Sequence, residues 1–266
     1  DNVKEVIQKI IHLKQFESID TSNRHSNQTR LPQFLFYGHP GTGKTTIARL
    51  LGKIFHSIGL LRKGHLVEVS RVDLVAGYVG QTAIKTNEKI IEALDGILFI
   101  DEAYSLKRDG MGEYGQEAID TIVKAMEDYV GRLVIIAAGY EDEMKEFVRS
   151  NPGLLSRFDT PVYFHDYTND ELLQIFKMFA GEESYDLPMN LEDLFLQHIE
   201  GEREITGEYF GNARSIRRMY DNMKRNYATR IMMLSENERQ ELDLKQNPTK
   251  LFTSEDFPSL EMVSDL

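Results

Sequence analysis

A glycine-rich segment at residues 38–45, Gly-His-Pro-Gly-Thr-Gly-Lys-Thr, has the most specific chemical pattern in the chain. It satisfies G-x-x-x-x-G-K-[ST], the pattern of a phosphate-binding P-loop. An apolar run of strand type at 34–37 precedes it, and apolar residues with helical spacing follow it over 45–56. Glycines let the backbone wrap closely around phosphates, and a helix N-terminus favours an anion. The segment therefore predicts a site for a nucleotide with a β- and a γ-phosphate.

Two side chains of this segment are expected to have separate tasks. Lys44 would bind the β- and γ-phosphates, and the Thr45 hydroxyl would bind Mg²⁺. The competing interpretation, a glycine-rich turn with a chance lysine, leaves the flanking strand and helix patterns unexplained. The residues predicted to bind ATP in this segment are Gly38, His39, Pro40, Gly41, Thr42, Gly43, Lys44, Thr45 and Thr46.

A second apolar run, at 96–100, ends in two adjacent carboxylates, Asp101 and Glu102. A continuous apolar run of this length is typical of a parallel strand that is buried on both faces. We expect Asp101 to hold the Mg²⁺ that bridges the phosphates and Glu102 to polarise the attacking water. The alternative is a surface turn that opens a helix, since carboxylates favour helix N-termini. The P-loop in the same chain favours the catalytic interpretation.

Composition narrows the class of protein. The chain has 266 residues, 41% of them hydrophobic, enough for one large domain or two smaller ones. It has no cysteine, which excludes disulfides and thiolate metal sites, and its histidines lack ligand spacing. We expect no membrane insertion and a cytoplasmic location, because neither a long apolar run nor a signal pattern is present. Since the first residue is Asp1 rather than Met, we expect a fragment or a processed form.

The formal charge of −12 bears on the partner. A chain this acidic is a poor candidate for nonspecific binding of nucleic acid, although a local basic patch remains open. The pattern therefore favours a protein as the partner over a nucleic acid.

Strand and helix patterns alternate over the first part of the chain. Such alternation predicts an α/β fold with a parallel sheet and helices on both faces, and ligands bind such sheets at the carboxyl ends of their strands. After Tyr167 only helical stripes follow. We therefore expect an α/β nucleotide-binding domain at 1–166 and a small helical domain at 167–266. The strands are expected at 34–37, 66–69, 97–100, 133–138 and 162–164, and the helices at about 45–56, 82–94, 114–128 and 141–149.

Taken together, the P-loop, the later Asp-Glu pair and a helical lid resemble an AAA+ ATPase. Within that superfamily, the chain is similar to the family of stage V sporulation protein K ATPases, red-type Rubisco activases and AAA+ components of type VII secretion systems. The motifs that carry this resemblance are, in chain order, Gly-Tyr-Val-Gly-Gln-Thr-Ala at 77–83, Leu-Phe-Ile-Asp-Glu-Ala-Tyr at 98–104, Tyr-Gly-Gln-Glu-Ala at 114–118, Ala-Gly-Tyr at 138–140, Asn-Pro-Gly at 151–153 and Gly-Asn-Ala-Arg at 211–214.

The resemblance implies roles for two arginines. Arg157 is similar to an arginine finger, which would neutralise charge on the γ-phosphate bound by a neighbouring subunit. The alternative is a surface arginine paired with Asp159. Arg214 is similar to the sensor 2 arginine, which would contact phosphate in its own subunit. A solvated basic face shared with Arg217 and Arg218 is the alternative.

The chain departs from the wider superfamily after the expected strand at 133–138. A polar residue, often Asn, usually stands there and orients the attacking water, whereas Gly139 and Tyr140 stand here. The closer family shares this feature, so the resemblance does not imply an inactive site. Either Tyr140 or Glu141 could take the role of this sensor 1 residue.

The segment at 78–80 concerns the expected action on a partner protein rather than the binding of ATP. By resemblance, Tyr78, Val79 and Gly80 would form a loop that faces the pore of a ring and grips a peptide by apolar contact. A tyrosine that anchors a turn onto the core is the alternative. Residues 107–113 could form a second pore-facing loop or an ordinary surface turn.

We therefore expect an ATP-hydrolysing protein remodeller that forms a homo-hexamer and pulls on a partner protein of unknown identity. A nucleotide-dependent assembly switch with slow turnover is the alternative. A nucleic-acid motor or loader is disfavoured by the charge and by the aromatic loop.

Overall fold

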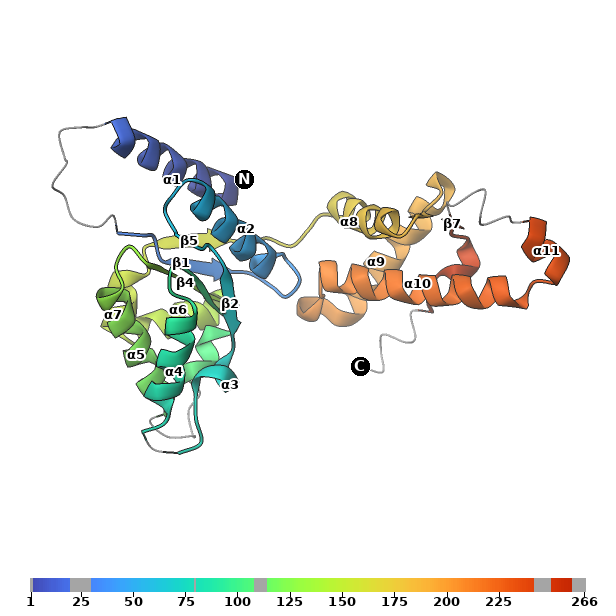
Figure 1. Ribbon diagram of the computed structural model, residues 1–266. Helices are drawn as coiled ribbons and strands as arrows, with labels where there is room; N and C mark the ends of the chain where they lie inside the picture. The colour runs from blue at the N-terminus through green and yellow to red at the C-terminus, as the bar shows by residue number, and fades with distance from the viewer. Residues whose placement is uncertain (1, 20–29, 79, 108–113, 242–249, 260–266) are drawn as a thin grey trace. The chain divides into compact units, whose positions relative to one another are not determined.

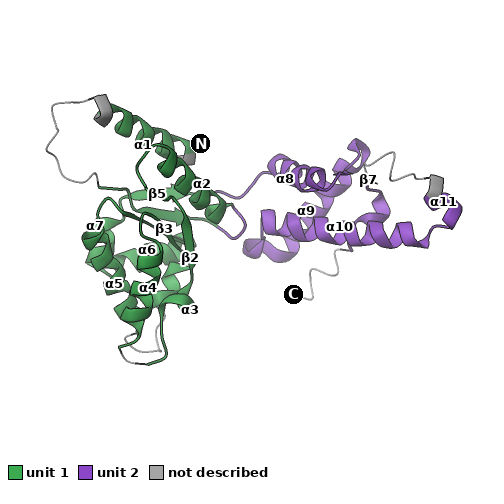
Figure 2. Cartoon of the chain, in the orientation of Figure 1, with its two compact units in different colours: residues 1–38, 43–164 green, residues 39–42, 165–266 purple. Residues whose placement is uncertain are grey.

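The computed structural model describes residues 2–19, 30–78, 80–107, 114–241 and 250–259 (Figure 1). The chain divides into two compact units (Figure 2). Unit 1 contains residues 1–38 and 43–164, and unit 2 contains residues 39–42 and 165–266. The chain thus leaves unit 1 and returns to it within the P-loop.

Unit 1 is built on a parallel sheet of five strands. Their order across the sheet is β2-β3-β4-β1-β5. Because β4 lies between β1 and β3, the two strands that precede the P-loop and the Asp-Glu pair both border it. The strands are β1 (Phe34–Tyr37), β2 (Leu66–Val69), β3 (Gly96–Ile100), β4 (Leu133–Gly139) and β5 (Thr160–Tyr163).

Helices cover both faces of this sheet, as the sequence predicted. Successive side chains of β4 point to opposite faces of the sheet. Ile136 packs into a cluster with α2 and α1, and the neighbouring Ile135 packs into a cluster with α4 and α5. Figure 1 shows these two groups of helices above and below the sheet. The helices of unit 1 are α1 (Asn2–Ile19), α2 (Lys44–Ser57), α3 (Arg71–Leu74), α4 (Thr82–Glu92), α5 (Tyr114–Asp128), α6 (Glu141–Arg149) and α7 (Pro152–Arg157), with a 3-10 turn η2 at Ala103–Lys107.

Unit 2 is helical, with its own core. Three aromatic side chains are fully buried there: Phe176, Phe195 and Tyr220. The ring centre of Phe176 lies 5.1 Å from that of Phe195 and 5.9 Å from that of Tyr220. Its principal elements are α8 (Asn169–Glu182), α9 (Glu192–Thr206), α10 (Ala213–Met233) and α11 (Glu236–Glu241), with 3-10 turns at Met189–Leu191, Gly207–Tyr209 and Ser254–Asp256.

Two features were not predicted. Unit 2 contains a short parallel ladder of β6 (Tyr185–Asp186) and β7 (Lys250–Leu251), and each of these strands is too short to give a period-2 pattern. Unit 1 contains the short helices α3 and α7, which are likewise below the length at which helical spacing is visible. No helix in the described ranges is both long enough and apolar enough to cross a membrane.

Candidate functional site

The predicted phosphate-binding and carboxylate segments meet at the carboxyl edge of the sheet. The P-loop follows β1 and the Asp-Glu pair follows β3, on either side of β4. The backbone links them directly, since the Gly38 N–H donates to the Gly139 carbonyl at 3.1 Å. Any group bound by the P-loop is therefore close to the end of β4.

The P-loop adopts a conformation that its glycines make possible. Gly43 has φ 93° and caps α2, which begins at Lys44 without a side-chain cap. Gly38 lies against Phe164, the residue after β5, where an added Cβ would meet the Phe164 carbonyl oxygen at 2.3 Å. The first-turn amides of a helix lack intrahelical partners, so the start of α2 favours an anion. The Lys44 ammonium donates to the Gly38 carbonyl at 2.6 Å, which keeps it over the loop.

The tip of the P-loop, residues 39–42, packs within unit 2 against the segment before α10. The Ala213 N–H donates to the Gly41 carbonyl at 3.2 Å. Gly41 has φ 74°, and an added Cβ there would meet the Gly211 carbonyl oxygen at 2.0 Å. The Tyr167 hydroxyl donates to the Thr42 carbonyl at 3.2 Å, and His39 pairs with Asp166 at 2.9 Å.

Asn212 organises this packing, and sequence reasoning gave it no role. Its side chain is fully buried, and its backbone has φ 49° and ψ −125°, outside the three main regions allowed for residues other than glycine. Its amide donates to the Asp166 carboxylate at 2.9 Å and to the Pro40 carbonyl at 3.4 Å. Its amide oxygen accepts from the Tyr167 N–H at 3.0 Å. The Gly-Asn pair before a long helix was the available signal.

The two carboxylates after β3 have different surroundings. Asp101 is half-buried, and its Oδ1 accepts from the Glu102 N–H at 3.1 Å. Glu102 is exposed and has φ 48°, a left-handed conformation that costs a non-glycine residue about 1–2 kcal/mol. The fold thus holds Glu102 in a strained backbone conformation at the edge of the predicted site.

These residues fit ATP and Mg²⁺. Gly38 and Gly41 leave no room for a Cβ, and the uncapped helix start and Lys44 both favour phosphate. Mg²⁺ prefers oxygen ligands and binds through one or two carboxylates together with substrate phosphates. Thr45 and Asp101 offer such oxygens. Among the described residues, no group of three or more His, Asp or Glu side chains could hold a metal without phosphate.

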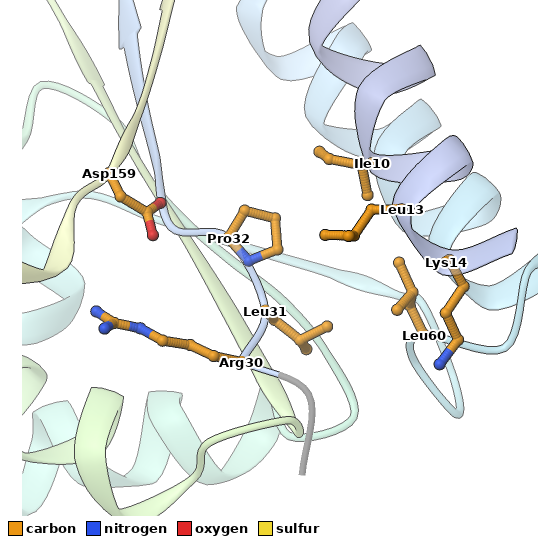
Figure 3. Close-up of a pocket in the computed structure, with 8 residues that line it drawn as sticks. All are labelled: Ile10, Leu13, Lys14, Arg30, Leu31, Pro32, Leu60 and Asp159. Atoms are coloured by element: carbon orange, nitrogen blue, oxygen red, sulfur yellow. The ribbon is translucent and has the colours of Figure 1, made fainter. Parts of the chain in front are cut away.

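A separate pocket of about 210 Å³ lies at the other edge of the same sheet (Figure 3). Leu31 and Pro32 precede β1, and Asp159 precedes β5, so the pocket is at the amino ends of these strands. It is therefore not part of the P-loop site. Its lining is Ile10, Leu13, Lys14, Arg30, Leu31, Pro32, Leu60 and Asp159.

Comparison with known proteins decides the family. Residues 34–166 match the family model described as "ATPase family associated with various cellular activities (AAA)", and residues 168–262 match the AAA lid domain. The chain belongs to the AAA ATPase family.

Curated relatives agree with this assignment. The chain is 46% identical to a CfxQ homolog of Pyropia yezoensis over 79% of its own length and 69% of the relative's. It is 45% identical to stage V sporulation protein K of Bacillus subtilis, covering 75% of the chain and 62% of that protein. It is 47% identical to the chloroplastic ribulose bisphosphate carboxylase/oxygenase activase of Cyanidioschyzon merolae, covering 74% and 67%. The chain thus spans about two thirds of the length of these relatives.

A solved structure has the same fold. The AAA domain of FIGL-1 in complex with ADP gives a TM-score of 0.56 over 100% of this chain and 80% of that one, at 17% identity. The five-stranded sheet and the helical lid are therefore the AAA arrangement, and the resemblance to the stage V sporulation protein K and Rubisco activase family is confirmed.

In this AAA ATPase, Arg157 is folded back onto its own unit. Its guanidinium pairs with Glu127 of α5 and donates to the Gly153 carbonyl at 3.1 Å, leaving the side chain 20% exposed. The expected alternative partner, Asp159, instead accepts from the Gln33 N–H at 3.2 Å. Arg157 therefore forms an ion pair within its own chain, and sequence reasoning did not predict Glu127 as its partner.

The three arginines at the start of α10 differ in their partners. Arg217 stacks over the Phe179 ring at 5.0 Å, and Arg218 pairs with Glu202. Arg214 is exposed and makes no hydrogen bond or ion pair with a described residue. Its backbone N–H donates to the Gly211 carbonyl at 2.9 Å, beside the P-loop tip. Of the three, Arg214 has the side chain available for an anion.

Tyr78 lies outside the core. Its side chain is 73% exposed, and added Cβ atoms on Gly77 and Gly80 would meet nothing within 4 Å. The alternative of a tyrosine anchored onto the core is therefore wrong. Val79 and residues 108–113, the other parts of the two predicted pore loops, lie outside the described residues.

The strained backbone at Glu102 makes a prediction about stability. Glycine adopts a positive φ without the Cβ clash, which offsets its usual entropic cost. We expect Glu102→Gly to lose hydrolysis yet be as stable as the wild type or up to about 1 kcal/mol more stable. The control is Glu146→Gly, an exposed position within α6 where glycine should cost about 0.5–1 kcal/mol. Urea unfolding without nucleotide measures both, and equal losses in the two variants would contradict a strained Glu102.

Proposed function

We propose that this AAA ATPase is an ATP-driven protein remodeller that works as a homo-hexameric ring. Residues 1–166 would be its nucleotide-binding domain and residues 167–266 its lid. The observation that carries the proposal is Tyr78, a large aromatic side chain that a glycine-flanked loop holds in solvent. One relative is named as an activase of another enzyme, which supports a protein as the partner.

The proposed division of labour at the nucleotide follows from the residues. Lys44 and the loop amides bind the phosphates of ATP, and Thr45 and Asp101 hold Mg²⁺. Mg²⁺ held by these two residues would supply positive charge to the bound phosphates. Glu102 orients the attacking water and accepts its proton. Arg214 binds phosphate from the lid of the same subunit.

Arg157 would complete the site of the neighbouring subunit. To reach a neighbour, its guanidinium must leave Glu127, so hydrolysis would wait for assembly. This pairing also favours the second candidate, a nucleotide-dependent assembly switch with slow turnover. The two candidates differ in whether an unfolded protein stimulates hydrolysis through Tyr78. A cytoplasmic location stays a prediction.

The role of Arg157 between subunits predicts complementation. Arg157→Ala should bind ATP nearly as the wild type does and hydrolyse it slowly, because a trans arginine contributes about 10³–10⁵-fold in related systems. Mixing it with Glu102→Gln protein should recover part of the activity, since a mixed ring contains some complete sites. Steady-state ATPase across a mixing titration measures this.

The matched control is Arg149→Ala, an exposed arginine that ends α6. It should stay within twofold of the wild type. A flat mixing titration, with ring assembly verified by light scattering, would contradict a finger that acts in trans.

The proposed role of Tyr78 predicts that a substitution there impairs the action on a partner protein without impairing ATP hydrolysis. Tyr78→Ala should keep basal ATPase within a few-fold and keep its melting temperature, because the side chain is 73% exposed. Stimulation by an unfolded probe protein, reduced and carboxymethylated α-lactalbumin, should be lost. Tyr78→Phe should retain much of it, because the grip is apolar.

Tyr209 of unit 2, 82% exposed, is the matched control, and Tyr209→Ala should leave stimulation unchanged. Persistent stimulation in Tyr78→Ala would reject the pore-loop role. So would a melting temperature and an ATPase rate that fall together.

A further inference from the structure

The end of β4 borders both halves of the nucleotide site, yet it has no polar side chain. Gly139 is its last residue, and its carbonyl accepts from Gly38 at the start of the P-loop. On the other side, the β3–β4 register pairs Ile100 with Ala137. That register ends at Ile100, and the Asp-Glu pair follows directly in the chain. A side chain that covers Gly139 is therefore beside the start of the phosphate-binding loop.

The side chain that covers Gly139 is Tyr104. A Cβ added to Gly139 would meet the Tyr104 ring at 2.7 Å and 2.8 Å from two of its carbons. The third close neighbour is the Met144 side chain of α6, at 2.9 Å. Glycine at 139 thus leaves space that the tyrosine ring from η2 occupies, and no larger residue would fit without displacing it.

The local backbone fixes this ring relative to Glu102. Tyr104 is two residues beyond Glu102, in the 3-10 turn that the Ser105 N–H closes by donating to the Glu102 carbonyl at 2.8 Å. The ring is half-buried, and its hydroxyl hydrogen-bonds to no described residue. Burial and then the negative charge of Glu102 raise the pKa of Tyr104 to about 12. The hydroxyl therefore keeps its proton near neutral pH and can donate it to an anion.

We propose that the Tyr104 hydroxyl is a catalytic group of this ATPase and donates a hydrogen bond to the γ-phosphate of ATP. The inference rests on the proposed binding of ATP at the P-loop. Tyr104 would do from η2 what a polar residue at the end of β4 does in the wider superfamily. This position of the Tyr104 ring requires glycine at 139, because a Cβ there would clash with the ring.

The two residues first considered for this role have other contacts. Glu141 pairs with Lys145 at 2.6 Å on the surface of α6. Tyr140 caps the same helix, where its carbonyl accepts from the Met144 N–H at 3.0 Å, and its ring centre lies 6.2 Å from that of Tyr104. Tyr140 is therefore the natural control, a second half-buried tyrosine beside the first.

The test removes one oxygen atom. Tyr104→Phe keeps the ring against Gly139 and loses only the hydroxyl. We expect kcat to fall at least about tenfold. This loss is smaller than the ~10²–10³-fold loss seen when a donor is removed from a preformed oxyanion hole. KM, ADP affinity and melting temperature should change less than about twofold or 2 °C, while Tyr140→Phe should keep the wild-type kcat.

A double-mutant cycle separates chemistry from packing. Gly139→Ala should displace the ring and lower kcat in the wild-type background, and it should add less than about twofold in the Tyr104→Phe background, because the hydroxyl is already gone. A Tyr104→Phe kcat within twofold of the wild type would overturn the proposal. So would additive effects of the two substitutions, since these would indicate packing alone. ADP binding by Lys44→Ala tests the P-loop placement separately.

Discussion

The position of β4 between β1 and β3 is the constraint on which the site depends. Parallel strands present all their carboxyl ends at one edge, so the loop after β1 and the acids after β3 converge there. The hydrogen bond from Gly38 to Gly139 fixes the start of the P-loop to the end of β4. Large apolar side chains on both faces of the sheet hold this register, and a slip of one residue would turn each of them to the wrong face.

The residues expected to act on the nucleotide differ in how firmly the fold holds them. The P-loop tip is held by backbone contacts with the segment before α10, centred on the buried Asn212. The Arg214 side chain, two residues further along, is exposed and makes no hydrogen bond or ion pair with a described residue. Arg157, by contrast, is held by Glu127 in the single chain. If Arg157 acts on a neighbouring subunit as proposed, it must first leave Glu127.

Local patterns were enough to predict the P-loop, the Asp-Glu pair and all five strands of the sheet, because each depends on residues adjacent in sequence. Local patterns could not predict the contacts between distant parts of the chain. The Tyr104–Gly139 and Arg157–Glu127 contacts join elements about 30 residues or more apart, and their residue types have no diagnostic spacing. The left-handed backbone of Glu102 is imposed by the turn into η2, not by its own preference. The ladder of β6 and β7 is two residues long and left no pattern.

We propose that Lys44 serves binding and Glu102 serves hydrolysis at one ATP site. Equilibrium binding of ATP to the Lys44→Ala and Glu102→Gln variants, with turnover measured on the same samples, tests it most directly. Lys44→Ala should bind ATP at least about 100-fold more weakly, because a charge-assisted contact to phosphate in a partly buried site is lost. Glu102→Gln should retain wild-type affinity and lose turnover. Equal loss of binding in the two variants would contradict this division of roles.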